Sequence, residues 1–444
     1  MDLTTLTWAP RARVFRRAYI KRRSATTGLF EASWFEITKD VKTWGTIQRH
    51  VDHIRPSLFR LNGITMKMAN DEGLYNPEDD EASHWFGYAN QQRTLLKIEA
   101  GFLDITLASA IYTRTEYPSD PTAYIGIVSG DVIVSSQNTV DLRIKPLLQV
   151  FEDFPARNLV GWTSTGLTAS QFITMLRDQT DGSSNYIFRP FFDNTTTTWE
   201  FTSTGTIYSN LNTSTAKDVI DLNVWDVIQK LAEAENHVPY ITRTGTFRFV
   251  PKSANTSTAQ WEFFGINSHD RTYGHTIKKI NSFGKKLENF YSRVEVKFVD
   301  TDTATSYAVA ETTLTVSGTN NTWNLGYRTF AFENFWIPNT ATASTIVTAI
   351  HDEYKTLKNE LDFVSTFIPT VDVLDRVEVS YDATALNPRS RWDMNNWADD
   401  PAGDDLYWDD SRGDAIRLTN EPFKVLSVEQ SIDKMETKII AREI

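Results

Sequence analysis

Residues 224–251, VWDVIQKLAEAENHVPYITRTGTFRFVP, contain both kinds of element that decide the fold. Apolar residues recur at every third or fourth position of 224–235, which predicts an amphipathic helix, and Asn223 is a favourable N-cap for it. The rest of the segment is rich in aromatic and β-branched residues and contains Thr244-Gly245, which predicts a β-hairpin turning there. A helix followed by a hairpin is therefore expected in the middle of the chain.

Outward from this segment, the dominant pattern is that of β-strands. In 293–299, Val294, Val296 and Phe298 alternate with charged residues, which predicts a half-buried strand. Two further helices are expected, at 169–178 after a cap at Thr168 and at 343–358. The predicted fold class is mainly β, a β-rich α+β protein. The other predicted strands are 29–37, 57–68, 93–108, a hairpin of 123–128 with 131–135, 139–144, 311–317, 327–337, 361–368, 376–381, 423–428 and 435–443.

The order of these elements predicts three domains. Phe154-Pro155 and the polar run 278–288 interrupt the pattern, so we place boundaries near residues 155 and 280. We expect an N-terminal β domain over 1–155, a helix-containing middle domain over 156–280 and a C-terminal β domain over 281–444.

Composition excludes several classes of protein. The chain has 444 residues with 13 Trp, 16 Tyr and 26 Phe, which requires packed cores, and it has no cysteine, which excludes disulfide scaffolds and zinc-thiolate sites. No apolar run reaches the roughly 18 residues that a membrane helix needs, and the N-terminus lacks the apolar stretch of a secretory signal. The net charge of −12 disfavours nucleic-acid binding, so no sequence-specific nucleic-acid partner is expected.

The positive charge is concentrated at the N-terminus. Residues 1–23 contain seven Lys and Arg against one Asp, a net charge of +6, so the remaining 421 residues carry −18. Two interpretations follow: an amphipathic strand with solvated charges, or a surface that binds an acidic face of another subunit or a nucleic acid. The candidate interaction residues here are Arg11, Arg13, Arg16 and Arg17.

The segment 390–414, SRWDMNNWADDPAGDDLYWDDSRGD, holds three Trp and eight Asp with almost no aliphatic residues. Calcium binding would use its carboxylates, although the spacing does not fit an EF-hand loop. Carbohydrate binding would use the tryptophan faces and the carboxylates together. The third interpretation is an interaction loop whose tryptophans bury against a neighbouring subunit. Its candidate interaction residues are Trp392, Trp397 and Trp408.

Catalytic and metal motifs are missing from the sequence. It has no H-E-x-x-H, G-x-S-x-G, G-x-x-x-x-G-K-[ST] or G-x-G-x-x-G pattern. His50 and His53 are three residues apart but have no evident third ligand, so structural roles are favoured. We therefore predict no catalytic residues, no metal site and no cofactor, and we expect that the chain is not an enzyme. An enzyme that degrades cell-wall polymer is the least favoured hypothesis.

Several segments, in this order, resemble the tail-hub and minor tail proteins of tailed bacteriophages. Residues 34–41 (WFEITKDV) resemble the family's E-I-T-x-x-V strand, and 124–128 (YIGIV) its F-x-G-x-I strand. In 70–77 (NDEGLYNP) the family's N-x-D-G-x-(F/Y)-x-P turn shows a one-residue irregularity, and 90–92 (NQQ) replaces its usual Pro-Gly. The other similar segments are 93–101, 224–250, 289–296 and 423–428, so the resemblance spans about residues 29–440.

The resemblance implies a fold, a function and partners. It implies two related β-barrel-like domains per chain and a homotrimer of pseudo-sixfold symmetry at the end of the tail tube. The implied role is a structural virion protein that joins the tube or distal tail ring to the tip and gates DNA passage. Its partners would be other copies of itself, the distal tail or tail tube protein, the tape measure protein and other tail-tip or fibre proteins. We expect it to be made in the host cytoplasm and to reside at the virion tail tip.

The alternative function is a tail-tip adhesin that binds host cell-surface carbohydrate through 390–414. It predicts that the full chain binds a sugar on a glycan array and that Trp397→Ala weakens this binding, because an aromatic ring stacks on the apolar face of a sugar. Absence of binding by both proteins would discard the adhesin.

Overall fold

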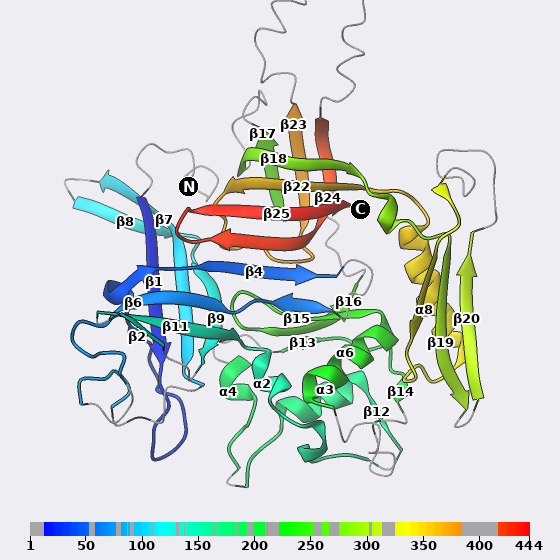
Figure 1. Cartoon of the computed structure of the whole chain (residues 1–444), viewed down its shortest axis with the longest axis horizontal. Helices are drawn as coiled ribbons and strands as arrows, with labels where there is room; N and C mark the ends of the chain where they lie inside the picture. The colour runs from blue at the N-terminus through cyan, green and yellow to red at the C-terminus, as the bar shows by residue number, and fades with distance from the viewer. Residues whose placement is uncertain are drawn as a thin grey trace, which may run out of the picture.

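The computed structural model consists of a central β-barrel and three other parts around it (Figure 1). A large sheet lies on one side of the barrel, a small α/β lobe on the other, and a helical region beneath. No helix among the residues that the structure describes is long and apolar enough to span a bilayer.

The structure describes residues 13–52, 58–76, 81–86, 88, 93–108, 111–129, 133–136, 138–163, 165–182, 184–192, 199–208, 211, 222–252, 259–265, 275–301, 304–312, 325–382 and 416–444.

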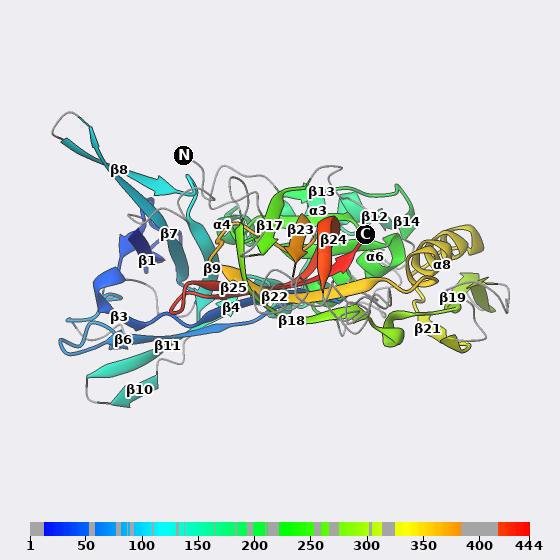
Figure 2. The same ribbon diagram turned by 90° about the horizontal axis from the view of Figure 1, so that it is seen from above.

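The N-terminal sheet has nine strands. Its central strand, β9, is buried at every position, because β7 and β11 flank it and the sheet packs on both faces. The β7–β8 hairpin extends away from the rest of the molecule (Figure 2). The strands are β1 (Arg13–Lys21), β2 (Phe35–Glu36), β3 (Val41–Thr43), β6 (Ile64–Ala69), β7 (Leu95–Ala108), β8 (Ile111–Tyr117), β9 (Thr122–Val128), β10 (Ile133–Ser136) and β11 (Thr139–Pro146), in the order β2-β1-β7-β9-β11-β6-β3 with β8 on β7 and β10 on β11.

This sheet curls but does not close. Its two end strands, β2 and β3, are consecutive in the chain and are connected by a single 3-10 turn, η1 (Thr38–Asp40). So short a connection requires the two ends of the sheet to approach each other. No strand pairing joins β2 to β3 in the described part of the sheet. In its described part, the N-terminal unit is therefore a partial barrel whose two margins, β2 and β3, do not pair with each other.

The C-terminal barrel is closed by six strands. They follow one another in the order β23-β17-β18-β22-β25-β24, and β23 also pairs with β24, which completes the ring. Alternate residues such as Phe363, Val425 and Ile439 fill its interior, as the predicted alternation requires. The strands are β17 (Trp261–Gly265), β18 (His275–Lys285), β22 (Asn359–Thr366), β23 (Arg376–Asp382), β24 (Arg417–Ser431) and β25 (Glu436–Glu443).

The N-terminal half of the chain contributes a hairpin to this barrel sheet. β24 pairs with β23 through its first half, and its last five residues, Ser427 to Ser431, pair with β4 (Thr46–Val51). β5 (Phe59–Leu61) then pairs with β4 at the edge of the sheet. The two β units are thus connected by hydrogen-bonded strands and not by packing alone.

The middle region confirms the helix and hairpin predicted from 224–251. The helix α6 (Val224–Glu235) begins with a capping box in which Asn223 and Asp226 exchange hydrogen bonds, and Asn236 in the left-handed conformation ends it. Aromatic rings from several elements pack together here, with Phe151 and Phe192 stacked 4.7 Å apart. The other elements are α2 (Gln149–Glu152), η2 (Ala156–Asn158), β12 (Leu167–Thr168), α3 (Ala169–Arg177), α4 (Arg189–Phe192), β13 (Glu200–Phe201), β14 (Ile207–Tyr208), β15 (His237–Ile241) and β16 (Phe247–Pro251).

An α/β lobe is inserted in the chain between β18 and β22. Its strands β19 (Arg293–Thr301), β20 (Ala304–Glu311) and β21 (Thr329–Glu333) form one sheet, and η3 (Leu287–Asn289) precedes them. The helix α8 (Thr340–Tyr354) covers one face of the sheet. The prediction of 343–358 was wrong at both ends. Asn339 caps the helix three residues earlier by accepting a hydrogen bond from the Thr342 amide at 2.9 Å, and the helix ends before the extended segment that leads into β22.

Three other predicted strands are not found as predicted among the described residues. In 29–37 only Phe35–Glu36 is a strand. The hairpin of 123–128 with 131–135 was wrong: β10 pairs with β11, because both edges of β9 are already occupied. Most of the predicted strand 311–317 lies outside the described residues, and the strand found there, β20, ends at Glu311.

The predicted fold class, mainly β with two barrel-like units and a helix-containing middle, is confirmed, although only the C-terminal barrel is closed. The domain boundaries near 155 and 280 stay a prediction.

Close packing at the centre of the partial barrel yields a test. A Cβ atom on Gly126 would lie 2.6 Å from Ile144 Cγ2 and 2.7 Å from the Lys145 carbonyl oxygen. We expect Gly126→Ala to lower the free energy of unfolding by about 1–3 kcal/mol, measured by urea denaturation, because the added methyl group overpacks the sheet. Gly182→Ala is the matched control, since nothing lies within 4 Å of its Cβ position. Equal stability of both variants would contradict this packing.

Candidate functional site

Four of the N-terminal basic residues, Arg13, Arg16, Arg17 and Lys21, lie on strand β1. Arg17 donates to Glu116 and lies 3.9 Å from Glu99, and pairing with Glu116 raises the pKa of Arg17. Arg16 donates to the Asp433 carbonyl oxygen at 3.0 Å, which connects the partial barrel to the turn between β24 and β25. Arg13 is exposed and forms no ion pair with any described residue. The amphipathic strand is thus present, and Arg13 is the arginine of β1 whose charge is exposed and in no ion pair with a described residue.

The remaining predicted site residues cannot be placed. Arg11 and the segment 390–414 with Trp392, Trp397 and Trp408 lie outside the described residues. Their roles stay predictions. Among the described residues, no group of three His, Asp or Glu side chains is arranged to hold a metal ion.

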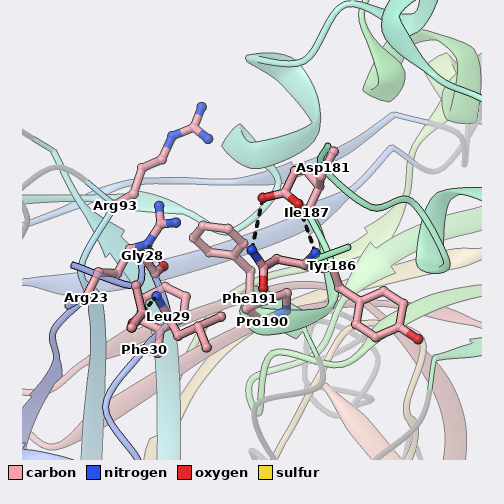
Figure 3. A pocket seen from close by; sticks show the side chains of 12 residues that line it. Arg23, Gly28, Leu29, Phe30, Arg93, Asp181, Tyr186, Ile187, Pro190 and Phe191 are labelled. Carbon is pink, nitrogen blue, oxygen red and sulfur yellow. Dashed lines mark hydrogen bonds between the residues drawn. The ribbon is translucent and has the colours of Figure 1, made fainter. Parts of the chain in front are cut away.

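A pocket of about 230 Å³ lies between the segment after β1 and the region around α4 (Figure 3). Arg23 and Arg93 line one side, and Arg23 donates to the Gly28 carbonyl oxygen at 2.9 Å. On the other side Phe191 contacts Phe30 edge to face at 5.3 Å. Burial and the charge of Arg93 lower the pKa of Arg23. The pocket has cations and aromatic rings but no nucleophile paired with a base, so its geometry suits a contact between parts.

A buried charged cluster connects three parts of the molecule. Arg49 on β4 is only 1% exposed, and its Nη1 atom donates to Gln430 on β24 at 3.1 Å. Its Nη2 atom donates to the Ala123 carbonyl oxygen on β9, and its Nε atom lies 3.9 Å from Asp372. Asp372 also accepts from the Arg243 amide of the β15–β16 turn at 3.1 Å. We name Arg49, Asp372 and Asp375 the junction cluster.

Sequence analysis did not identify this cluster. The available signal was the strand 46–51, in which Ile47, Arg49 and Val51 share the buried face. An arginine at an inward position requires a buried partner. The partner, Asp372, is more than 300 residues away in the chain, so the pairing depends on the tertiary structure.

Asp375 is the most perturbed carboxyl group of the cluster. Burial, followed by the nearby charge of Asp372, raises the pKa of Asp375 to about 7. Its Oδ2 atom accepts hydrogen bonds from Trp261 Nε1 and from the Asp372 amide, both at 2.9 Å. These donors hold the carboxyl group in place in either protonation state.

Comparisons with known proteins give one kind of match. No family model and no curated protein matches the chain. Among solved structures, the chain is similar to a tail protein from Neisseria meningitidis, with 10% identity, 96% of each chain covered and a TM-score of 0.49. It is also similar to the 43 kDa tail protein of prophage MuSo2 from Shewanella oneidensis (9% identity, 96% of this chain and 98% of that one, TM-score 0.46). A third is prophage tail protein gp18 from Listeria monocytogenes (11% identity, 96% and 94% covered, TM-score 0.46). These are phage tail proteins, the class that the sequence resemblance names.

The raised pKa of Asp375 predicts a pH-dependent stability. An unfolded Asp titrates near 3.8, so between about pH 4 and 7 the folded protein binds one more proton than the unfolded chain. The free energy of unfolding therefore falls with rising pH by up to about 1.4 kcal/mol per unit over this window, and this contribution is constant above it.

Asp375→Asn should remove this slope, because the amide oxygen still accepts hydrogen bonds but does not titrate. The measurement is urea unfolding of both proteins from pH 4.5 to 8, with exposed Asp71→Asn as the control. Parallel profiles of wild type and Asp375→Asn would contradict the assignment.

Proposed function

We propose that this chain is a structural subunit of a phage tail and that it assembles as a homotrimeric hub at the distal end of the tail. The observation that carries the proposal is that one chain contains both a closed six-stranded barrel and a partial barrel. The end strands of the partial barrel do not pair with each other in its described part. The ordered segments that resemble tail-hub proteins support it from the sequence.

The free margins of the partial barrel favour assembly. A strand margin presents unpaired amide and carbonyl groups, which attract another chain unless they are covered. A closed ring of identical subunits covers such margins without leading to open-ended growth. Two β units per chain mean that three chains place six β units around one axis, which suits docking on a sixfold tail ring.

The proposal includes the partners and the location. The hub would join the tail tube or distal tail protein above to tip or fibre proteins below, contact the tape measure protein and gate the passage of DNA. The chain's net charge of −12 suits a channel wall that does not retain DNA. In this arrangement the N-terminal basic segment contacts an acidic face of the neighbouring subunit.

Mass photometry of the purified chain, alone and with tail tube or distal tail protein, tests the hub. We expect a particle of three subunits of 50.6 kDa each, with annular shape in low-resolution images. A chain that stays monomeric in all of these mixtures would overturn the proposal.

The position of the basic segment has its own test. We expect the double variant Arg11→Glu and Arg13→Glu to weaken the trimer at least tenfold, because it replaces two attractive charges by repulsive ones at the subunit contact. Arg60→Glu, an exposed arginine of β5, is the matched control and should assemble like wild type. An unchanged trimer in the double variant would exclude the basic segment from the contact while leaving the hub intact.

A further inference from the structure

A pocket of about 330 Å³ lies where the middle region, the helix α8 and the barrel meet. Residues from five different elements or their flanking segments converge on it, so it forms only in the complete chain. Its charged side chains are Lys252, Lys358, Lys424, Arg442, Glu353 and Glu443. We name it the basic pocket.

The barrel contributes a row of cations to this region. Lys424 on β24 is the register partner of Arg376 on β23 and of Arg442 on β25, so the three side chains share one face of the sheet. It is the outer face, because their neighbours Val377, Phe423 and Ala441 fill the barrel interior. Like charges at directly opposed positions of a sheet repel each other. The row therefore requires negative charge nearby.

Arg442 forms no salt bridge with a carboxylate of the described residues, although its charge interacts with that of Glu353 at longer range. Its side chain is buried, with the residue only 4% exposed, and neither Nη1 nor Nη2 has a hydrogen-bond partner in the described part of the chain. Its guanidinium lies over the ring of Tyr354 at 4.2 Å. Glu360, its register partner on β22, instead accepts hydrogen bonds from Lys286 and Asn289. A buried guanidinium with two open donors is costly unless an acceptor occupies the pocket.

The two carboxylate side chains of the pocket are already used. Glu353 pairs with Lys252 Nζ at 2.8 Å. Glu443 accepts hydrogen bonds from the amide and the side chain of Asn359 at 2.9 and 2.8 Å. Four cationic side chains thus face two carboxylate side chains, which leaves a net charge of +2 among the side chains that line the pocket.

We propose that the basic pocket binds an oxyanion carrying at least two negative charges. Arg442 supplies the two guanidinium donors, which match two oxygens of one carboxylate, sulfate or phosphate group. Lys424 and Lys358 supply the flanking charges. The same chemistry is offered by a free anion and by acidic side chains of a neighbouring subunit.

Sulfate is the first probe, because it does not titrate between pH 7 and 9. Isothermal titration of the full chain with sodium sulfate, against sodium chloride at equal ionic strength, should show saturable binding of sulfate only. Arg442→Met should lower the sulfate affinity at least tenfold. Lys438→Met is the matched control on the same strand, since Lys438 pairs with Asp362 at 3.4 Å outside the pocket, and should bind like wild type.

Stability provides the second readout. Arg442→Met keeps the unbranched apolar part of the side chain and removes a buried charge, so it should remain folded. Sulfate should raise the melting temperature of wild type more than that of the variant, because only wild type binds it in the pocket. If Arg442→Met fails to fold, Lys424→Met serves the same purpose. Equal sulfate affinity in wild type and in the folded variant would overturn the proposal.

Proton uptake gives a third readout. Burial lowers the pKa of Lys424 to about 8. The charged groups around it are Glu353, Lys252 and Lys358, together with its register partners Arg376 and Arg442. A bound dianion favours protonated Lys424, so binding at pH 8 should take up a fraction of a proton, up to about one half. Titrations in buffers of different ionisation enthalpy measure this uptake. Sulfate binding without proton uptake, and with the same affinity at pH 7 and 9, would contradict the role of Lys424.

A final comparison distinguishes the two sources of the anion and rests on the proposed function. If acidic side chains of a neighbouring subunit occupy the pocket, sulfate should weaken the wild-type trimer, and Arg442→Met should weaken it without sulfate. If the ligand is a free anion, the trimer should be insensitive to both changes. Failure of the trimer itself would leave the titrations on the isolated chain valid.

Discussion

The burial of Arg49 is the constraint on which the arrangement of the parts depends. This arginine lies on β4, which in sequence falls between β3 and β6 of the partial barrel but pairs with the barrel strand β24. Its guanidinium reaches β9, Gln430 and Asp372, and so contacts both β units at once. Breaking a buried ion pair by removing one partner typically costs about 3–5 kcal/mol, so the two units have one favourable relative position.

The two β units differ in how completely their own strands pair the backbone amide and carbonyl groups. The C-terminal barrel closes on itself through the β23–β24 pairing. The partial barrel brings β2 and β3 to within one 3-10 turn of each other along the chain, but in its described part the two strands do not pair. A strand margin that is not paired presents amide and carbonyl groups, and these groups favour contact with a further segment or a further chain.

The positive charges of this acidic chain gather where its parts meet. Arg16 and Arg17 connect β1 to neighbouring elements, Arg49 and Arg243 connect the two β units with the middle region, and Lys252, Lys424 and Arg442 lie between the barrel, α8 and the middle region. A cation at such a boundary contacts carbonyl oxygens and carboxylates from both sides. The basic pocket differs from the other boundaries, because both Nη atoms of Arg442 are without a hydrogen-bond partner among the described residues, whereas Arg16 and Arg49 lack one there only at Nε.

The sequence by itself determined the elements whose stability is local. The helix α6 was predictable to the residue, because its cap and its apolar spacing lie within one continuous segment. The helix α3 was predictable with its cap Thr168, and it ends at Arg177, one residue before the predicted end. Alternating strands such as 293–299 were predictable, because side chains of a strand point alternately to its two faces and apolar residues at every second position therefore indicate one buried face.

The tertiary structure decided which strands pair, which sheet closes and where the charged side chains meet. β10 joins β11 because β9 has no free edge, and Asp372 meets Arg49 across more than 300 residues. Strand partners and ion pairs of this kind depend on contacts between segments that are distant in sequence, and a local sequence pattern does not predict the energy of such contacts.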